Sequence, residues 1–478
     1  MSLVNNKYYL FASYMFVILF FILFFTMYTW AKRSEKSGFR ILLRVRLNIA
    51  DWAVLVFATI TLLSAALTPY NSYFAFWGLP TRRDGAATQL LYIAVYFIVS
   101  RWYKPRENDF VFFSASAILV ALIGVFQFYG MDFFGLGGRH ISAVTADGAI
   151  CSYNTWYLTT IGNINFVSTY ACMAILLCGF LFVRHNSKLR YVWLSGSALN
   201  LWLLIMTSYS GMVGTLAAMV LAIPFITQSK KYLGRFFILA SSFAAVLFLH
   251  RLFYNTLVLG AATAAELIIL AALMLLLAAA GLSLSKAAYA PQPDAPVKWK
   301  RGVILIAVCI IAGLAGILIF GGSDSAGPVY QAREILRGNV QDDFGTHRIH
   351  IWRNALRAVP QRPLIGSGPD SFYYAFPRDA QGVFNEYYDK AHNEYVQILV
   401  CQGILGLLSY LVFLGTVFIK AVPKAFRNPL IMPVLAAFTG YCIQAFFNIS
   451  LPIVGQFLWV FAGLVANKNV IAGTLGRV

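Results

Sequence analysis

The chain has 478 residues, of which 60% are hydrophobic and only 12% are charged, and its mean hydropathy is +0.71. Soluble globular domains carry about 25% charged residues, and the apolar residues here recur in blocks along the whole length, so one buried core does not account for them. The composition excludes a water-soluble globular protein and predicts an integral membrane protein.

Apolar segments long enough to approach a membrane span recur from one end of the sequence to the other. A spanning helix needs about 20 apolar residues. We predict helices for thirteen segments: 10–30, 51–68, 86–100, 109–128, 160–183, 191–208, 211–227, 235–253, 257–282, 302–320, 393–419, 430–448 and 452–467. The predicted fold class is therefore an all-α polytopic membrane protein with about 12–13 transmembrane helices.

The net charge of +19 invites a nucleic-acid interpretation. About two thirds of the Lys and Arg residues, however, fall in seven short segments that alternate with uncharged ones: 31–50, 101–108, 184–190, 228–235, 283–301, 420–429 and 467–478. This alternation is what the positive-inside rule predicts, so these segments face the cytoplasm and favour contact with anionic membrane lipid, not nucleic acid.

The first apolar stretch, Tyr8 to Trp30, is too long for a signal peptide and lacks its small-residue cleavage pattern. Basic residues follow it, so we expect it to remain as a helix with its amino end outside the cytoplasm. The organisation that follows has three parts: residues 1–320 hold the first ten spans, 321–392 form an extracytoplasmic loop, and 393–478 hold the last three spans.

The long loop has a pattern of its own. Residues Gln341 to Pro360 show helical spacing of apolar side chains, and "RPLIGSGPDSF" then ends the helix with two prolines and two glycines. We therefore predict a folded and partly helical loop.

The sequence offers little for metal or redox chemistry. Five of the six cysteines lie in apolar segments without CxxC spacing, which argues against a zinc site or a disulfide framework. Asp342 and Asp343 are adjacent, and consecutive side chains of a helix point in different directions. We expect no metal and no cofactor. Acidic residues at depth in the spans are also scarce, which argues against an ion-coupled pump.

Cations gather at the ends of segments on the outer face: Arg82, Arg83, Arg139, Arg348 and His392. Arginine binds phosphate through a bidentate fork, and a lipid pyrophosphate in the outer leaflet would present its head group at this depth. The alternative is that these arginines reach lipid head groups without any specific ligand. A lone interfacial histidine is likewise more often structural than catalytic.

Two motifs nevertheless resemble the bacterial O-antigen ligase and polymerase family, which includes lipid-A-core ligases and O-linked protein oligosaccharyltransferases. The stronger match is "AHNEYVQILVCQGILG" at 391–406, and the second is "GTHRIHIWRNALRAVPQRPLIGSGPDSF" at 345–372. Weaker similarities are "WGLPTRRDG" at 77–85 and "GNINF" at 162–166.

This resemblance implies a C-type glycosyltransferase in the bacterial cytoplasmic (inner) membrane, with its active site facing the periplasm or cell exterior. It would transfer a glycan from an undecaprenyl diphosphate donor to a hydroxyl of a glycan, lipid or protein acceptor, without a metal. His392 would be the base and Arg348 the diphosphate ligand. In-line displacement would invert the anomeric carbon. We expect His392 and Arg348 to face one cleft under the long loop.

The remaining site assignments also come from the resemblance and from the outer cations. The candidate substrate-binding residues are Arg82, Arg83, Arg139, Asn163, Asn165 and Asn393. In one respect the sequence departs from the family: many members carry an arginine at the outer turn that reads "TSYSGMVG" here, and Ser210 occupies that position.

Three alternatives remain open. A peptidoglycan-polymerase-like glycosyltransferase would be expected to use an outer-loop aspartate, and a metal-dependent oligosaccharyltransferase would need a carboxylate pair for Mg²⁺ or Mn²⁺. A flippase or other transporter of lipid-linked oligosaccharides would place its cations in a central cavity.

Overall fold

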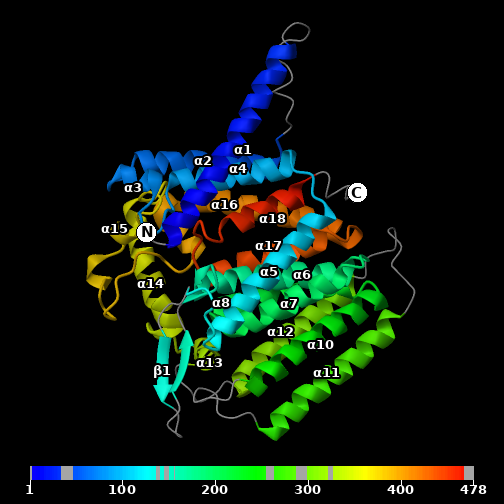
Figure 1. The fold of residues 1–478 in the computed structure, drawn as a ribbon. Coiled ribbons are helices and arrows are strands. Elements are labelled where there is room, and N and C mark those ends of the chain that lie inside the picture. Colours follow the sequence, from blue (N-terminus) through cyan, green and yellow to red (C-terminus); the bar gives the residue numbers. More distant parts are fainter. Residues whose placement is uncertain are drawn as a thin grey trace. The chain divides into compact units, whose positions relative to one another are not determined.

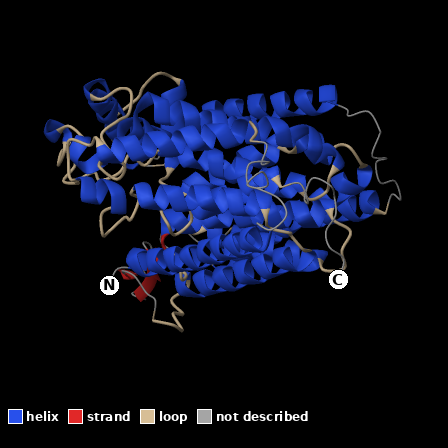
Figure 2. Cartoon of the chain, turned by 90° about the horizontal axis from the view of Figure 1, so that it is seen from above, coloured by secondary structure: helices blue, strands red, loops and turns tan. Residues whose placement is uncertain are grey.

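The computed structural model describes residues 3–33, 47–135, 140–144, 150–154, 157–253, 263–286, 299–320 and 327–467. Over these residues the chain is almost entirely helical, and the strands are confined to four short segments (Figure 2). The predicted fold class is confirmed: the protein is an all-α polytopic membrane protein. The described residues divide into two compact units.

The first unit contains the described residues up to Trp102, together with Thr346–Ile419 and Ile449–Gly463. Its elements are α1 (Leu3–Arg33), α2 (Ile49–Ala66), α3 (Ser72–Trp77), α4 (Ala86–Arg101), most of α14 (Phe344–Ala358), η1 (Val359–Gln361), α15 (Phe372–Ala375), η2 (Arg378–Ala380), the first part of α16 (Glu394–Arg427) and most of α18 (Gln456–Ala466).

The second unit contains Tyr103–Gly345, Lys420–Asn448 and the described residues from Leu464 onward. Its elements are α5 (Glu107–Phe128), β1 (His140–Val144), β2 (Ile150–Asn154), β3 (Tyr157–Leu158), β4 (Gly162–Asn163), α6 (Ile164–Arg184), α7 (Arg190–Ile205), α8 (Tyr209–Leu221), α9 (Ile223–Ile226), α10 (Lys230–Phe253), α11 (Ala264–Ser285), α12 (Trp299–Phe320), α13 (Pro328–Leu336), the end of α16, α17 (Ile431–Gln444) and η3 (Ala445–Phe447). The strands form two antiparallel pairs, β1 with β2 and β3 with β4.

Each of the thirteen predicted segments contains a helix. Among the described residues, eight helices are long and apolar enough to cross a membrane, and four shorter apolar helices accompany them. The segment predicted at 191–208 is α7, which has only 16 residues. Within the second unit α6 is the central helix, because its apolar window is completely buried and it packs against α7, α8 and α17.

Two helices of the second unit have the opposite character. Only 6% of the apolar window is buried in α11 and in α12, so nearly their whole apolar surface is available to lipid. α11 lies beside α10 (Figure 1). Gly234 and Gly281 allow the close approach, since a Cβ on Gly281 would lie 2.8 Å from the carbonyl oxygen of Gly234.

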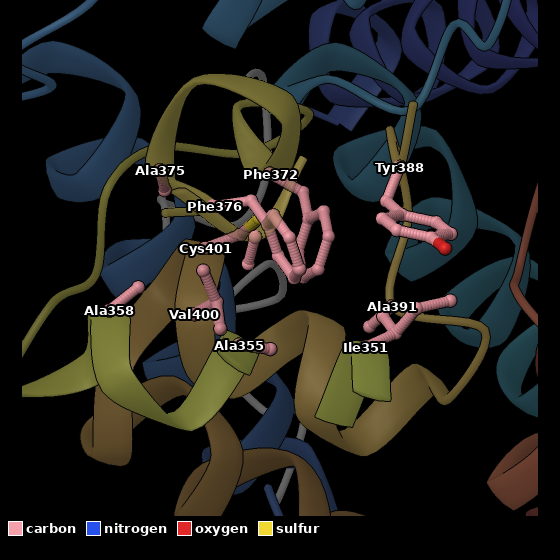
Figure 3. Packing of buried hydrophobic residues seen from close by; sticks show 11 residues of the cluster. Ile351, Ala355, Ala358, Phe372, Ala375, Phe376, Tyr388, Ala391, Val400 and Cys401 are labelled. Atoms are coloured by element: carbon pink, nitrogen blue, oxygen red, sulfur yellow. The ribbon is translucent and has the colours of Figure 1, made fainter. Parts of the chain in front are cut away.

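The part of the first unit between Ile351 and Cys401 has its own apolar core. Ile351 and Ala355 of α14 pack against Phe372 and Phe376 at α15, and against Val400 and further residues of α16 (Figure 3). These side chains come from both recognised motifs. Their burial fixes α14 against the start of α16, which is the segment that carries His392.

α16 is not one continuous helix, because Gly403 has non-helical backbone angles (φ 69°, ψ −174°). The segment 363–368 docks at this break: the N–H of Ile404 donates to the carbonyl of Pro363 (2.8 Å), and the N–H of Gly368 donates to the carbonyl of Cys401 (2.8 Å). Glycine is needed at Gly366 and Gly403, since a Cβ on either would lie 2.4 Å from the opposite backbone. The glycines of the two motifs thus serve one backbone junction.

Candidate active site

Two segments of the long loop and one segment from near the amino end of the chain meet at a buried ion cluster within the first unit. The Nζ atom of Lys390 lies 2.7 Å from Oδ2 of Asp84 and 2.8 Å from Oδ1 of Asp370, and the lysine side chain is only 1% exposed. Asp370 also accepts hydrogen bonds from the N–H groups of Leu79 (2.6 Å) and Asp84 (3.3 Å). Burial by itself would lower the pKa of Lys390, but Asp370 and Asp84 outweigh it and raise that pKa, so the lysine stays charged.

His392 follows this cluster by two residues and directly precedes α16. Asn393 caps the helix, because its Oδ1 accepts from the N–H groups of Tyr395 (3.0 Å) and Val396 (3.1 Å). The carbonyl of Ala391 accepts from the indole N–H of Trp352 on α14 (2.9 Å). The candidate base therefore stands at the entrance of a capped helix, with fixed backbone on both sides.

The environment of His392 keeps its imidazole neutral. Burial lowers the pKa of His392 to about 4, and the positive charges of Arg348, Arg82 and Lys390 act in the same direction, opposed by Asp389. The imidazole makes no hydrogen bond to the described part of the chain. At neutral pH it therefore carries a lone pair that can accept a proton.

Arg348 lies on α14, one turn before Trp352 and on the same helix face. Trp352 bonds to the carbonyl of Ala391, and this places Arg348 toward the His392 end of the site. Burial lowers the pKa of Arg348 to about 10, which leaves the guanidinium charged at neutral pH. The charge of Arg348 lowers the pKa of His392, and the catalytic roles predicted for the two residues stay predictions.

Arg82 contributes to the same site through Asp389. Its Nε lies 2.6 Å from Oδ2 of Asp389 and its Nη2 lies 3.0 Å from Oδ1, which is a bidentate pair. The two side chains are 31% and 30% exposed, so the pair is reachable from outside. Burial would raise the pKa of Asp389, but the bonds and charge of Arg82 overcome this and lower it.

Arg83 points elsewhere. Its Nε donates to Oδ1 of Asn5 (2.8 Å) and its Nη2 donates to the hydroxyl of Tyr9 (2.9 Å), both near the amino end of α1. The amino end of α1 therefore lies on the same side as the segment around Arg82, which is the relative orientation expected from the charge pattern. Nothing tests a substrate-binding role for Arg83, which stays a prediction.

The asparagines of the "GNINF" motif belong to the second unit. Asn163 caps α6, since its Oδ1 accepts from the N–H of Asn165 (2.9 Å), and the carbonyl of Asn165 accepts from Nδ2 of Asn448 (2.7 Å). These contacts explain the motif as a helix start, and substrate binding by Asn163 and Asn165 stays a prediction. Ser210 is buried in the first turn of α8, with its hydroxyl 3.1 Å from that of Ser208. Arg139 lies outside the described residues.

Strained backbone marks the same segments. Seven non-glycine residues have a positive φ in the part of the chain that the structure describes, and five of these are Arg83 (56°), Thr346 (54°), His347 (64°), Asp370 (54°) and His392 (48°). Such conformations cost about 1–3 kcal/mol each and persist where the surroundings determine them, often at functional sites. Three of the five lie within two residues of a member of the ion cluster, or belong to it.

A cavity of about 30 Å³ adjoins the cluster, and Asp84, Asp370 and Glu394 contribute to its polar lining. It has room for about two water molecules and not for a sugar. Its lining includes neither His392 nor Arg348, so a common cleft for these two residues stays a prediction. Within the described ranges, no group of three His, Cys, Asp or Glu residues is arranged to hold a metal ion.

Sequence reasoning missed most of the carboxylates and the lysine that organise the site. Four residues lie inside or beside the recognised motifs: Asp84, Asp370, Asp389 and Lys390. The sequence prediction concerned cations that could bind a phosphate, so it took in neither the carboxylates nor a lysine that is buried between them. An available signal was the equal number of acidic and basic residues in the long loop, which indicates internal pairing.

Comparisons with known proteins agree with the motifs. Residues 256–411 match the family model described as O-antigen ligase, a range that contains Arg348, Asp370, Lys390 and His392. This part of the chain is similar to O-antigen ligases. The match covers about a third of the chain. The recognition of the O-antigen ligase and polymerase family is thereby confirmed.

A curated relative supports the same family. It is the exopolysaccharide production protein ExoQ of Rhizobium meliloti (strain 1021), which is 26% identical over 175 residues. The aligned part is 34% of this chain and 38% of ExoQ, so the chain matches well under half of the relative's length. Together with the eight apolar helices, the two comparisons support a multi-pass membrane protein related to proteins of glycan assembly.

Proposed function

We propose that this protein is a membrane glycosyltransferase of the O-antigen ligase or polysaccharide polymerase type. It transfers a glycan from an undecaprenyl diphosphate donor to an acceptor hydroxyl at the outer face of the bacterial cytoplasmic membrane. The observation that carries the proposal is the setting of His392: a neutral imidazole under the electrostatic influence of Arg348, from the same loop, and of Arg82, from a distant part of the sequence.

The residue types match the reaction. The acceptor oxygen attacks the anomeric carbon, its proton passes to the imidazole of His392, and the bond from the anomeric carbon to the diphosphate oxygen breaks. The leaving undecaprenyl diphosphate carries away the bonding electron pair, and Arg348 stabilises its growing negative charge. Attack opposite the leaving group inverts the anomeric configuration.

A histidine with a pKa of about 4 is a weak base. In this proposal, binding of the donor raises the pKa of His392. The diphosphate is negatively charged, so its binding beside Arg348 offsets the positive field that acts on His392. Opposite charge near an imidazole favours its protonated form and raises its pKa. In this proposal His392 becomes an effective base only when the donor is in place.

Arg82 has a second role in the proposal. Two of its five N–H donors are engaged by Asp389, which fixes the guanidinium plane beside the segment that carries His392. The pair with Asp389 also sets the direction of the other N–H groups of Arg82. The positive charge of Arg82 favours binding of the diphosphate. The contacts of Arg83 with Asn5 and Tyr9 make it the less suitable second cation.

Reconstitution with a defined donor tests the proposal. The purified protein in lipid vesicles is mixed with an undecaprenyl diphosphate oligosaccharide and a panel of glycan, lipid and protein acceptors, and new glycosidic bonds are measured by mass spectrometry. We expect transfer by the wild type, and loss of at least about 100-fold in His392→Ala, the lower end of typical acid–base contributions. The exposed Lys188, remote in sequence from the motifs, provides the control Lys188→Met, which should retain full transfer.

Two results would contradict the proposal. The first is movement of the donor across the bilayer without any new bond, which is the behaviour of a flippase. The second is full transfer by a correctly inserted His392→Ala protein, which would remove the base from its assigned place.

A further inference from the structure

We propose that Lys390 is a positioning residue for the transfer reaction: clamped between Asp84 and Asp370, it fixes the backbone that presents His392 to the substrates. This inference rests on the proposed function, and nothing in the two comparisons assigns a role to Lys390. Its basis is the geometry of a buried cluster that ties two segments of the long loop to the distant segment around Asp84.

The cluster uses all four carboxylate oxygens. For Asp84, Oδ2 pairs with Lys390 (2.7 Å) and Oδ1 accepts from Nε2 of Gln89 on α4 (2.9 Å). For Asp370, Oδ1 pairs with Lys390 (2.8 Å) and Oδ2 accepts from the backbone N–H groups of Leu79 and Asp84. Three of these oxygens accept hydrogen bonds, and the fourth, Oδ1 of Asp370, forms an ion pair with the ammonium group, so Lys390 is held between the two carboxylates.

Strained backbone occurs at each arm of the cluster. Arg83 (φ 56°) precedes Asp84, Asp370 itself has a φ of 54°, and His392 (φ 48°) follows Lys390 by two residues. A left-handed conformation at a non-glycine residue is unfavourable by itself and needs surrounding contacts that determine it. The buried ion pairs provide such contacts for all three segments at once.

Three other residues of the segment 389–393 also make contacts that fix its backbone. Asp389 pairs with Arg82, Ala391 bonds to Trp352 and Gln397, and Asn393 caps α16. Lys390 brings a buried charge to this segment, since its side chain is only 1% exposed. Replacing Lys390 therefore keeps the contacts of Asp389, Ala391 and Asn393. It removes the contact that fixes the backbone two residues before His392.

A purely structural role would produce a different result. If Lys390 only stabilised the fold, its replacement would reduce the amount of folded enzyme, while the folded molecules kept their rate constants. A positioning role predicts a fall in kcat with a nearly constant KM for the donor, since the proposed phosphate ligands Arg348 and Arg82 remain.

The experiment compares Lys390→Met, the neutral triple variant K390M/D84N/D370N and the control Lys188→Met with the wild type. The triple variant is included because Lys390→Met leaves two buried carboxylates without their cation and is at risk of misfolding. Monodisperse, folded protein is quantified first, and kcat and KM are then measured with the undecaprenyl diphosphate oligosaccharide. We expect about a 100-fold loss of kcat in both Lys390 variants, as for a misplaced catalytic group, with little change in KM and none in the control.

A second readout does not depend on transfer. Diethyl pyrocarbonate modifies neutral imidazoles, so the pH dependence of modification of the peptide containing His392, followed by mass spectrometry, reports its titration. Four charged groups act on that imidazole: Arg348, Arg82, Lys390 and Asp389. Removal of the Lys390 charge and of its clamp should move the midpoint to higher pH in Lys390→Met, and Lys188→Met should leave the midpoint unchanged.

The outcomes separate the two proposals. If the wild type forms no glycosidic bond, the proposed function fails, and the shifted His392 titration still supports the clamp. If the wild type is active and a folded Lys390 variant keeps its kcat, the positioning role is overturned. It is equally overturned if both Lys390 variants fail to fold while the control folds, because Lys390 would then be required for the fold itself.

Discussion

Replacing Arg348 by Met should shift the acid limb of the pH profile of kcat/KM to higher pH. The proposed base must be neutral to accept a proton, so the rate is lost as the pH falls through the pKa of His392. In the wild type this pKa is about 4, because burial and then the charge of Arg348 lower it from its usual 6.5. Removing the guanidinium of Arg348 removes the largest charge effect on the pKa of His392, and the effect of burial on that pKa remains.

The size of the shift is bounded by these values. Since burial is the larger cause, the limb in Arg348→Met should lie above 4 and below 6.5. At pH 5, a base with a pKa of 4 is about 90% neutral, whereas a base with a pKa of 6.5 is about 3% neutral. The extra loss of kcat/KM at pH 5, relative to pH 8, therefore cannot exceed about 30-fold.

Arg348→Lys separates the electrostatic role of Arg348 from its proposed role as a ligand. Lysine keeps the positive charge but not the planar fork that binds a diphosphate in a bidentate manner. We expect a lower kcat/KM at every pH with the acid limb near its wild-type position. Initial rates at subsaturating donor, measured from pH 3.5 to 8.5 in vesicles with both faces buffered, provide the profile. A wild-type limb near 6.5, or an unmoved limb in Arg348→Met, would refute the coupling between the two residues.

Three further predictions use different measurements. Transfer should persist in excess EDTA, because the proposed mechanism assigns charge stabilisation to arginine; a loss that Mg²⁺ or Mn²⁺ restores would favour a metal-dependent transferase. The acid limb of kcat should lie above that of kcat/KM, since the bound diphosphate raises the pKa of His392; coinciding limbs would show that donor binding does not tune the base. Gly366→Ala and Gly403→Ala should each lower the free energy of unfolding by about 2 kcal/mol or more, measured by thermal denaturation in detergent. Gly316→Ala in α12, whose Cβ would meet no atom within 4 Å, is the control, and equal stability of all three variants would contradict the close backbone junction.

The helices were predictable because the bilayer imposes a simple rule on the sequence. A segment that crosses lipid must be apolar over most of its length and must satisfy its backbone internally. All thirteen predicted segments contain helices for this reason, including α11, whose side chains are largely exposed to the lipid phase. The same rule identified the long loop, where prolines and glycines interrupt the helical pattern.

The break in α16 could not be found in this way. "CQGILG" has the composition of a continuous apolar helix, and hydropathy carries no signal for a single residue that leaves the helical region. Gly403 leaves it because the backbone of 363–366 approaches from a distant part of the sequence. A local pattern does not report such a contact, since the cause lies in another segment.

The same difference between local patterns and contacts with other segments applies to the candidate site. His392 and Arg348 could be proposed as candidates because their motifs are contiguous and specific. The partners of Lys390 were not found, since each is a single carboxylate in a polar segment and Asp84 lies 306 positions from Lys390. Pairing of buried charges is required by desolvation, but the sequence does not say which charges are buried.

The charges of the site explain why a weak base and an unusual density of cations occur together. Lys390 is paired with two carboxylates and Arg82 with one, and the charges of Arg348, Arg82 and Lys390 all lower the pKa of His392 against the opposing effect of Asp389. A positive field disfavours protonation of the imidazole and favours binding of a diphosphate, and these are two consequences of one arrangement. Under the proposed mechanism, reactivity toward a hydroxyl is therefore low in the empty protein and rises when the donor binds and adds negative charge. Such coupling would protect the lipid-linked glycan from premature attack, because the base is activated by the same molecule that it helps to cleave.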